Sequence, residues 1–248
     1  MSRVFPDNWI GNLWDGYELR CREGTIWRIG EKISERSTLM PGHPSTGQGR
    51  AEAQAVYHCE QIVQGKPNDK RAIIKVRMQV PSEYPPSFNP DVRASLAQQQ
   101  PSGWALQEIQ SLRYFNAKNC TVVPKLLNVV MSWQSEPDMP IPKGYLVFIV
   151  MERVPGVPLD KFWSYELPKR HKIRASFLDA LDRELLKLGA RARDCKLDNL
   201  IYDQSTDKCY FVDFEDIEAK ETNPAVQFSP DHYFLWGLAK DYNGRDVY

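Results

Sequence analysis

The sequence has no surplus of charge of either sign. Its 32 Lys and Arg residues are balanced by 32 Asp and Glu residues, so the formal net charge is zero. Binding to nucleic acid or to a membrane surface relies on surplus Lys and Arg that neutralise phosphates. A neutral chain is a poor candidate for either, and we expect no nucleic-acid partner and no membrane partner.

Patterns typical of metal-binding and disulfide-rich proteins are missing as well. The five cysteines are scattered, their number is odd, and no two of them form a CxxC pair. None of the four histidines has a second His or Cys at the spacing of metal ligands. We therefore expect neither a structural zinc site nor a disulfide scaffold.

No apolar run approaches the length of a transmembrane helix, and the first residues lack the basic start and apolar stretch of a signal peptide. We expect a cytoplasmic protein, with the nucleus as the alternative. What the sequence does have is the composition of a globular protein, with 42% hydrophobic and 26% charged residues. Its 248 residues can form one large domain or two lobes.

The expected elements separate a strand-rich first part from a helical second part, which makes the fold class α+β. A Pro- and Gln-rich segment at residues 81–102 is interpreted as an inserted, mobile loop, and a long helix is predicted at residues 169–189. We predict two parts, residues 1–154 and 155–248. The first has one helix at 104–118 and five strands, at residues 25–33, 53–63, 71–80, 125–133 and 144–154.

Two charged residues of the first part suit a site for nucleotide phosphates. Lys75 lies between apolar neighbours in the strand "AIIKV", which would hold its ammonium group on a rigid element. A Lys with a buried stem needs a carboxylate partner, and Glu108 lies on the predicted helix. Taken alone, each is more often an ordinary surface residue.

A second group of polar residues follows the long helix. Asp194 and Asn199 are five residues apart, and Asp213 ends the apolar run "CYFV". Phosphoryl transfer needs a base near the attacking hydroxyl and a few oxygen ligands for Mg²⁺. Asp194 suits the first task, Asn199 and Asp213 the second, and Lys196 would neutralise the transferred phosphate. The alternative is that these side chains form Asx turns and end a hairpin.

Together these segments resemble the protein-kinase-like fold shared by eukaryotic protein kinases and by aminoglycoside and choline phosphotransferases. The resemblance covers about residues 25–218, and "DFED" after a compact catalytic loop is similar to small fungal kinase-like proteins of unassigned substrate. It implies two lobes, an antiparallel five-stranded sheet with one helix followed by a shortened helical lobe. The matching segments, in the family's order, are "AIIK", "QEIQSL", "VMERVPG", "ARDCKLDN" and "VDFE".

The resemblance also implies ATP and Mg²⁺ as cofactors, and it implies nucleotide contacts for five residues. Lys75 would contact the α- and β-phosphates and pair with Glu108. Met151 would line the rear of the adenine pocket, and the backbone of Glu152 and Val154 would meet the adenine edge.

The same resemblance assigns the chemistry to the second part of the chain. Asp194 would accept or orient the substrate hydroxyl, and Lys196 would reach the γ-phosphate. Asn199 and Asp213 would bind Mg²⁺. Every charged catalytic position of the family is thus filled in this sequence.

Several positions depart from the family's pattern. Ala192 replaces the usual His of the catalytic loop, and Glu215 stands where many protein kinases have Gly. The phosphate-covering loop is not defined, since the region holds Gly30, Gly47 and Gly49 but no GxGxxG. Few residues follow Asp213 and none form an APE-like anchor, so we expect most of the usual substrate surface to be absent and a partner protein to cover the shortened lobe. The segment "DHYFLWGLAKDY" resembles the helix beneath the catalytic loop, with Trp236 and Leu238 as core residues.

Three hypotheses follow. The first is a phosphotransferase that transfers the γ-phosphate of ATP to an unknown hydroxyl acceptor, either a small molecule or a protein. The second is a pseudokinase, a nucleotide-binding or scaffolding module without turnover, which Ala192 and the short second part favour. The third is a shortened, degenerate product that exposes an apolar patch where helices are missing.

Overall fold

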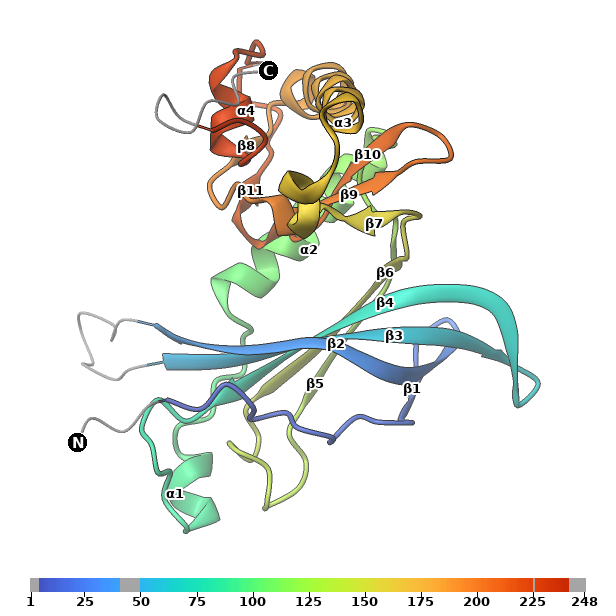
Figure 1. The fold of residues 1–248 in the computed structure, drawn as a ribbon. Helices are drawn as coiled ribbons and strands as arrows, with labels where there is room; N and C mark the ends of the chain where they lie inside the picture. The colour runs from blue at the N-terminus through green and yellow to red at the C-terminus, as the bar shows by residue number, and fades with distance from the viewer. Residues whose placement is uncertain (1–4, 41–49, 225, 241–248) are drawn as a thin grey trace. The chain divides into compact units, whose positions relative to one another are not determined.

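The computed structural model describes residues 5–40, 50–224 and 226–240. The chain combines helices and antiparallel strands and divides into two compact units (Figure 1). The first unit consists of Met1–Ala105 and Leu126–Glu152, and the second of Leu106–Lys125 and Arg153–Tyr248. The first unit thus ends two residues before the predicted boundary, and the second takes in residues 106–125, which the prediction had assigned to the first.

A six-stranded antiparallel sheet forms the first unit, in the order β1-β2-β3-β4-β6-β5 (Figure 1). The prediction of five strands is wrong by one, because residues 18–20 pair with residues 26–28. Three residues are too few for an alternating pattern to reveal a strand. The strands are β1 (Glu18–Arg20), β2 (Ile26–Met40), β3 (Arg50–Val63), β4 (Lys66–Val80), β5 (Leu126–Trp133) and β6 (Tyr145–Glu152).

Strands β2 and β3 are longer than predicted, because they extend into the residues between the predicted strands 25–33 and 53–63. Ala51, Ala53 and Ala55 of β3 are completely buried, while β2 contributes Ser37 and Thr38 to the same pairing. In a strand, alternate side chains face opposite sides, so the alanines lie on one face of β3, and Glu52 and Gln54, which are also buried, lie on the other. Ala, Ser and Thr in this arrangement do not look like a strand in sequence.

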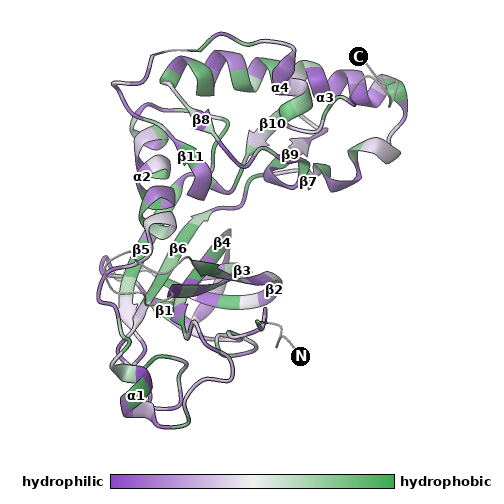
Figure 2. Cartoon of the chain, turned by 90° about the vertical axis from the view of Figure 1, so that its left-hand side faces the viewer, coloured by the Kyte–Doolittle hydropathy of each residue, from purple (hydrophilic) through white to green (hydrophobic). Residues whose placement is uncertain are grey.

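Strand β6 is the opposite case. Its residues are buried on both faces as far as Val150 and Met151, and both of its edges are paired, with β4 and with β5. Figure 2 shows the green of hydrophobic residues along this strand. A strand covered on both sides has a continuous apolar run in place of alternation, which is why its position was predicted well.

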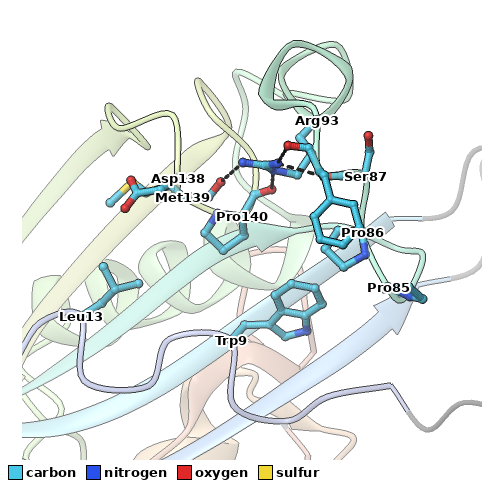
Figure 3. Close-up of a pocket in the computed structure, with 10 residues that line it drawn as sticks. Trp9, Leu13, Pro85, Pro86, Ser87, Arg93, Asp138, Met139 and Pro140 are labelled. Carbon is cyan, nitrogen blue, oxygen red and sulfur yellow. Dashed lines mark hydrogen bonds between the residues drawn. The ribbon is translucent and has the colours of Figure 1, made fainter.

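The predicted loop 81–102 contains a short helix, α1 (Pro90–Ala94), which was not expected. Arg93 of this helix donates hydrogen bonds to five backbone carbonyls, three of which belong to the segment 137–140 (Figure 3). A hollow of about 470 Å³ lies beside these contacts and is also lined by Trp9 and Leu13. The guanidinium therefore ties the two connections together, and the mobility of the loop stays a prediction.

The second unit combines helices with two small sheets. Helix α2 (Gly103–Ala117) enters it from Leu106 onwards. The other helices are α3 (Leu167–Ala180), α4 (Asp231–Leu235) and 3₁₀ turns, including Leu159–Ser164. The sheets have the orders β10-β9-β7 and β11-β8. Their strands are β7 (Val157–Pro158), β8 (Arg191–Ala192), β9 (Leu200–Asp203), β10 (Lys208–Phe211) and β11 (Ile217–Glu218). None of the helices in the described residues is long and apolar enough to cross a bilayer.

The long helix predicted at residues 169–189 is confirmed as a continuous helical segment, but its α-helical part ends at Ala180. After α3 the chain continues as a π-helical turn, Leu181–Leu185, and a 3₁₀ turn, Leu186–Leu188. It ends at Gly189, whose φ of 72° is the left-handed conformation of a helix C-terminus. Phe177 of α3 packs with Trp236, which is buried as predicted, and Leu238 is buried too.

Gly156, just before β7, permits a close approach of two backbone segments. Its φ is 111°, and a Cβ atom there would lie 2.4 Å from the carbonyl oxygen of Tyr202 in β9. We expect Gly156→Ala to lower the free energy of unfolding of the second unit by about 3 kcal/mol, since it adds overlap to backbone strain. Urea unfolding measures the loss. Gly65→Ala is the matched control, because Gly65 also has a positive φ of 76° but has open space around it. Equal losses in the two variants would contradict the role of the contact with β9.

Candidate functional site

The loop that carries Asp194 and Asn199 lies between β8 and β9 in the second unit. β8 pairs with β11, and β9 pairs with β10. Asp213 lies in the turn between β10 and β11, so the two strand pairs hold this turn beside the loop. The backbone N–H of Val212 donates to the carbonyl oxygen of Asn199 at 2.9 Å, which joins the turn to the loop directly. Residues that are fourteen apart in sequence are therefore neighbours in the structure.

Within the loop, three predicted residues are linked by hydrogen bonds. The Nζ atom of Lys196 donates to Oδ2 of Asp194 at 2.5 Å, and both side chains are partly exposed. Asn199 is buried, with 4% of its surface exposed, and its Nδ2 donates to the carbonyl oxygen of Asp194 at 3.0 Å. No donor in the described part of the chain reaches Oδ1 of Asn199. An amide oxygen of this kind is a ligand that Mg²⁺ accepts.

The turn at Asp213 has an unusual backbone conformation that its surroundings hold in place. Asp213 has a φ of 65°, which is uncommon for a residue with a side chain and recurs at functional sites. The next residue, Phe214, is buried and its ring centroid lies 5.6 Å from that of Phe115 on α2. The hydroxyl of Ser111 on α2 donates to the carbonyl oxygen of Ile217 at 2.5 Å. Helix α2 therefore positions the turn within the second unit.

Three carboxylates meet at this point. Oxygen atoms of Glu108, Asp213 and Glu215 lie within 4.8 Å of one another, and Glu108 has none of its surface exposed. Carboxylate oxygens this close together form a set that could hold a divalent cation. Glu215 was not among the predicted site residues. The available signal was a Glu directly after "DF", where many protein kinases have Gly.

The remaining predicted nucleotide residues are divided between the units. Lys75, Met151 and Glu152 belong to the first unit, where Lys75 is buried in β4 with 5% of its surface exposed and Met151 lies near the end of β6. Glu108 and Val154 belong to the second. The pairing of Lys75 with Glu108 and the adenine contacts of Met151, Glu152 and Val154 stay predictions.

The glycines considered for a phosphate-covering loop are only partly accounted for. Gly47 and Gly49 lie outside the described residues. Gly30 lies inside β2, at a shift of register between Ile29 and Lys32. It is therefore part of a strand irregularity, and the phosphate loop stays undefined.

Cys195 lies between Asp194 and Lys196 and is the remaining reactive side chain of the loop. Burial raises the pKa of its thiol to about 11, and the charge of Asp194 adds to this rise. The thiolate is the nucleophilic form of cysteine, so this thiol is unreactive near neutral pH. The roles of Asp194 and Lys196 in the same loop stay predictions.

Comparisons with known proteins do not establish a family. No protein-family model matches the chain, and no curated protein matches its sequence. Among solved structures, it is similar to the kinase PK-1 of Cydia pomonella granulovirus, with a TM-score of 0.47 and 17% sequence identity. The match covers 89% of this chain and 74% of that chain. A function has to be argued from the residues of this chain.

Proposed function

We propose that this protein is a phosphotransferase that uses ATP and Mg²⁺ and transfers the γ-phosphate to a hydroxyl group of a small molecule or a protein. The observation that carries the proposal is the joining of the Asp194–Asn199 loop to the Asp213 turn by the bond between Val212 and Asn199. Phosphoryl transfer depends on positioning and on charge more than on covalent chemistry. The second unit holds together the carboxylate of Asp194, the ammonium group of Lys196 and the two proposed metal ligands, and these groups meet that need.

Asn199 and Asp213 would hold the metal ion. Oδ1 of Asn199 has no donor in the described residues, and Asp213 supplies a carboxylate from the turn that the backbone bond of Val212 joins to Asn199. Mg²⁺ would neutralise charge on the nucleotide phosphates, and it keeps several of its waters when bound. The carboxylates of Glu108 and Glu215, within 4.8 Å of that of Asp213, would accept hydrogen bonds from such waters. Glu108 would also pair with the ammonium group of Lys75, as the sequence predicts.

Asp194 and Lys196 would carry the transfer itself. The acceptor oxygen forms a bond to the γ-phosphorus while the bond between this phosphorus and the β,γ-bridging oxygen breaks, and ADP leaves. The acceptor's proton passes to the carboxylate of Asp194 and then to solvent. Lys196, which donates to Asp194 at 2.5 Å, would donate to the oxygens of the transferred phosphate. Lys75 would bind the phosphates, and Met151, Glu152 and Val154 would bind the adenine.

Thermal unfolding with and without MgATP tests the metal-nucleotide site before any acceptor is known. A ligand that binds only the folded state, at a hundred times its Kd, stabilises by about 2.7 kcal/mol, which is a shift of a few degrees in Tm. We expect this shift in wild type, and we expect EDTA or Asp213→Ala to remove it. Asp198→Ala is the matched control, since Asp198 is an exposed residue of the same loop. A shift of equal size in Asp213→Ala would contradict the assignment of the metal ligand.

The alternative is a nucleotide-binding or scaffolding module without turnover. It is favoured by Ala192, which pairs with Ile217 of β11 through the backbone and whose methyl group cannot form the hydrogen bond that a His side chain would provide. A shift of Tm with MgATP, combined with no transfer of labelled phosphate to any acceptor or to water, would support this alternative.

A further inference from the structure

The two edges of the six-stranded sheet differ in how they are protected. One edge consists of the short strand β1 and the part of β2 beyond it, which carry charged residues and two shifts of register. The other edge is β5, the outermost strand beside β6 (Figure 2). Its eight residues, LLNVVMSW, include no charge, no proline and no glycine. Charges and bulges prevent further pairing at an edge, whereas a long uncharged edge invites it.

The outward backbone groups of β5 can be identified from its ladder. The backbone N–H of Gln134 donates to the carbonyl oxygen of Gly144, next to the start of β6. Tyr145 lies opposite Trp133 in the ladder, but its backbone N–H donates to the carbonyl oxygen of Gln98 and not to β5. Backbone groups alternate along an antiparallel strand, so those of Val129, Met131 and Trp133 point away from β6. No hydrogen bond in the described parts of the chain reaches these groups.

Exposed apolar side chains accompany the open backbone. Met131 is 52% exposed and Trp133 is 59% exposed, on the same face of β5 because they are two residues apart. A Trp and a Met that remain open to water beside an unpaired edge are typical of a surface that pairs with another chain.

We infer that two copies of this chain associate through their β5 strands, antiparallel about a two-fold axis at Met131. A strand that pairs with its own copy in this way forms a symmetric, self-complementary interface. Met131 then lies opposite its copy and Val129 opposite Trp133, so that each outward N–H meets a carbonyl. The strand carries no charge that would repel its copy, and the zero net charge of the chain does not oppose association. The two sheets become one. This inference does not depend on the proposed enzymatic function.

Sedimentation equilibrium of the full chain over a hundredfold range of concentration tests the inference. We expect wild type to show a monomer–dimer equilibrium, and Met131→Lys, which places two ammonium groups at the axis, to weaken dimerisation at least tenfold. Ile33→Lys is the matched control, since Ile33 is 50% exposed on β2, near the opposite edge, and we expect it to dimerise like wild type.

A second variant tests the backbone pairing itself. Met131→Pro removes an outward N–H, which an edge strand tolerates without losing its own sheet, and it should abolish the dimer while circular dichroism stays as in wild type. A wild type that is monomeric at every concentration overturns the inference and leaves the edge to a different partner. A dimer that survives Met131→Lys, or that Ile33→Lys weakens equally, also overturns it.

Discussion

Asp194→Asn is expected to reduce phosphate transfer by about 10³-fold, because the amide cannot accept the proton of the attacking hydroxyl. The substitution preserves the shape of the side chain, and it leaves the backbone oxygen that Nδ2 of Asn199 binds at 3.0 Å. The loop should therefore keep its conformation while the base is lost. Transfer of labelled γ-phosphate to water, to the protein itself and to a panel of hydroxyl compounds is the measurement.

A second readout separates loss of chemistry from loss of the nucleotide site. Asp194→Asn should keep the increase in Tm with MgATP that Asp213→Ala loses, because Asp194 is not a proposed metal ligand. Asp198→Asn makes the same chemical change at an exposed position of the same loop and should transfer phosphate at the wild-type rate. Equal transfer by wild type and Asp194→Asn across the panel would exclude the proposed mechanism.

The second large effect is expected in the first unit, where Arg77→Met should lower the free energy of unfolding by about 3–5 kcal/mol. Nη1 of Arg77 lies 2.6 Å from Oε1 of Glu52, and the two side chains are 1% and 3% exposed. The hydroxyl of Tyr145 donates to the other oxygen of Glu52 at 2.9 Å. Burial, together with the nearby Glu52, raises the pKa of Tyr145, so its hydroxyl remains a donor. Without Arg77, the buried carboxylate of Glu52 keeps one neutral donor, Tyr145, among the described residues.

The double variant Arg77→Met with Glu52→Leu distinguishes the cost of an unpaired charge from the worth of the pair. Because it removes both charges, it should be more stable than Arg77→Met alone, although Tyr145 then loses an acceptor at a cost of about 1 kcal/mol. Urea unfolding followed by fluorescence and circular dichroism gives the values. Asp179→Asn breaks an exposed pair with Arg183 and should change little. If the double variant loses as much free energy of unfolding as the two single variants together, the cost does not come from the unpaired charge.

Much of the fold could be predicted from local patterns. The helix at residues 104–118 is confirmed as α2, since one apolar stripe, which includes Leu112 and Phe115, is buried. The continuous apolar run of β6 was equally clear. What local patterns could not reveal is β1, which is a strand only because residues 26–28 lie beside it, and α1, whose Arg93 is satisfied by carbonyls more than forty residues away.

The residues of the candidate site were selected from the sequence, and the structure supplies the contacts between them. Asp194, Lys196, Asn199 and Asp213 were selected by type and spacing, and the structure brings the first three together beside the Asp213 turn. Glu215 was missed as a neighbour of Asp213 and Glu108. Its place depends on the packing of α2 against the turn.

The sequence by itself determined the zero net charge, the strand-rich and helical parts, and the set of polar residues that we propose for MgATP chemistry. These are local properties, set by composition, periodicity and the order of short motifs. Only the tertiary structure decided that three carboxylates meet, that Asp213 adopts a left-handed conformation and that β5, not β4 or β6, forms an open edge. The physical reason is that strand order and side-chain proximity arise from contacts between residues far apart in sequence, which no local pattern contains.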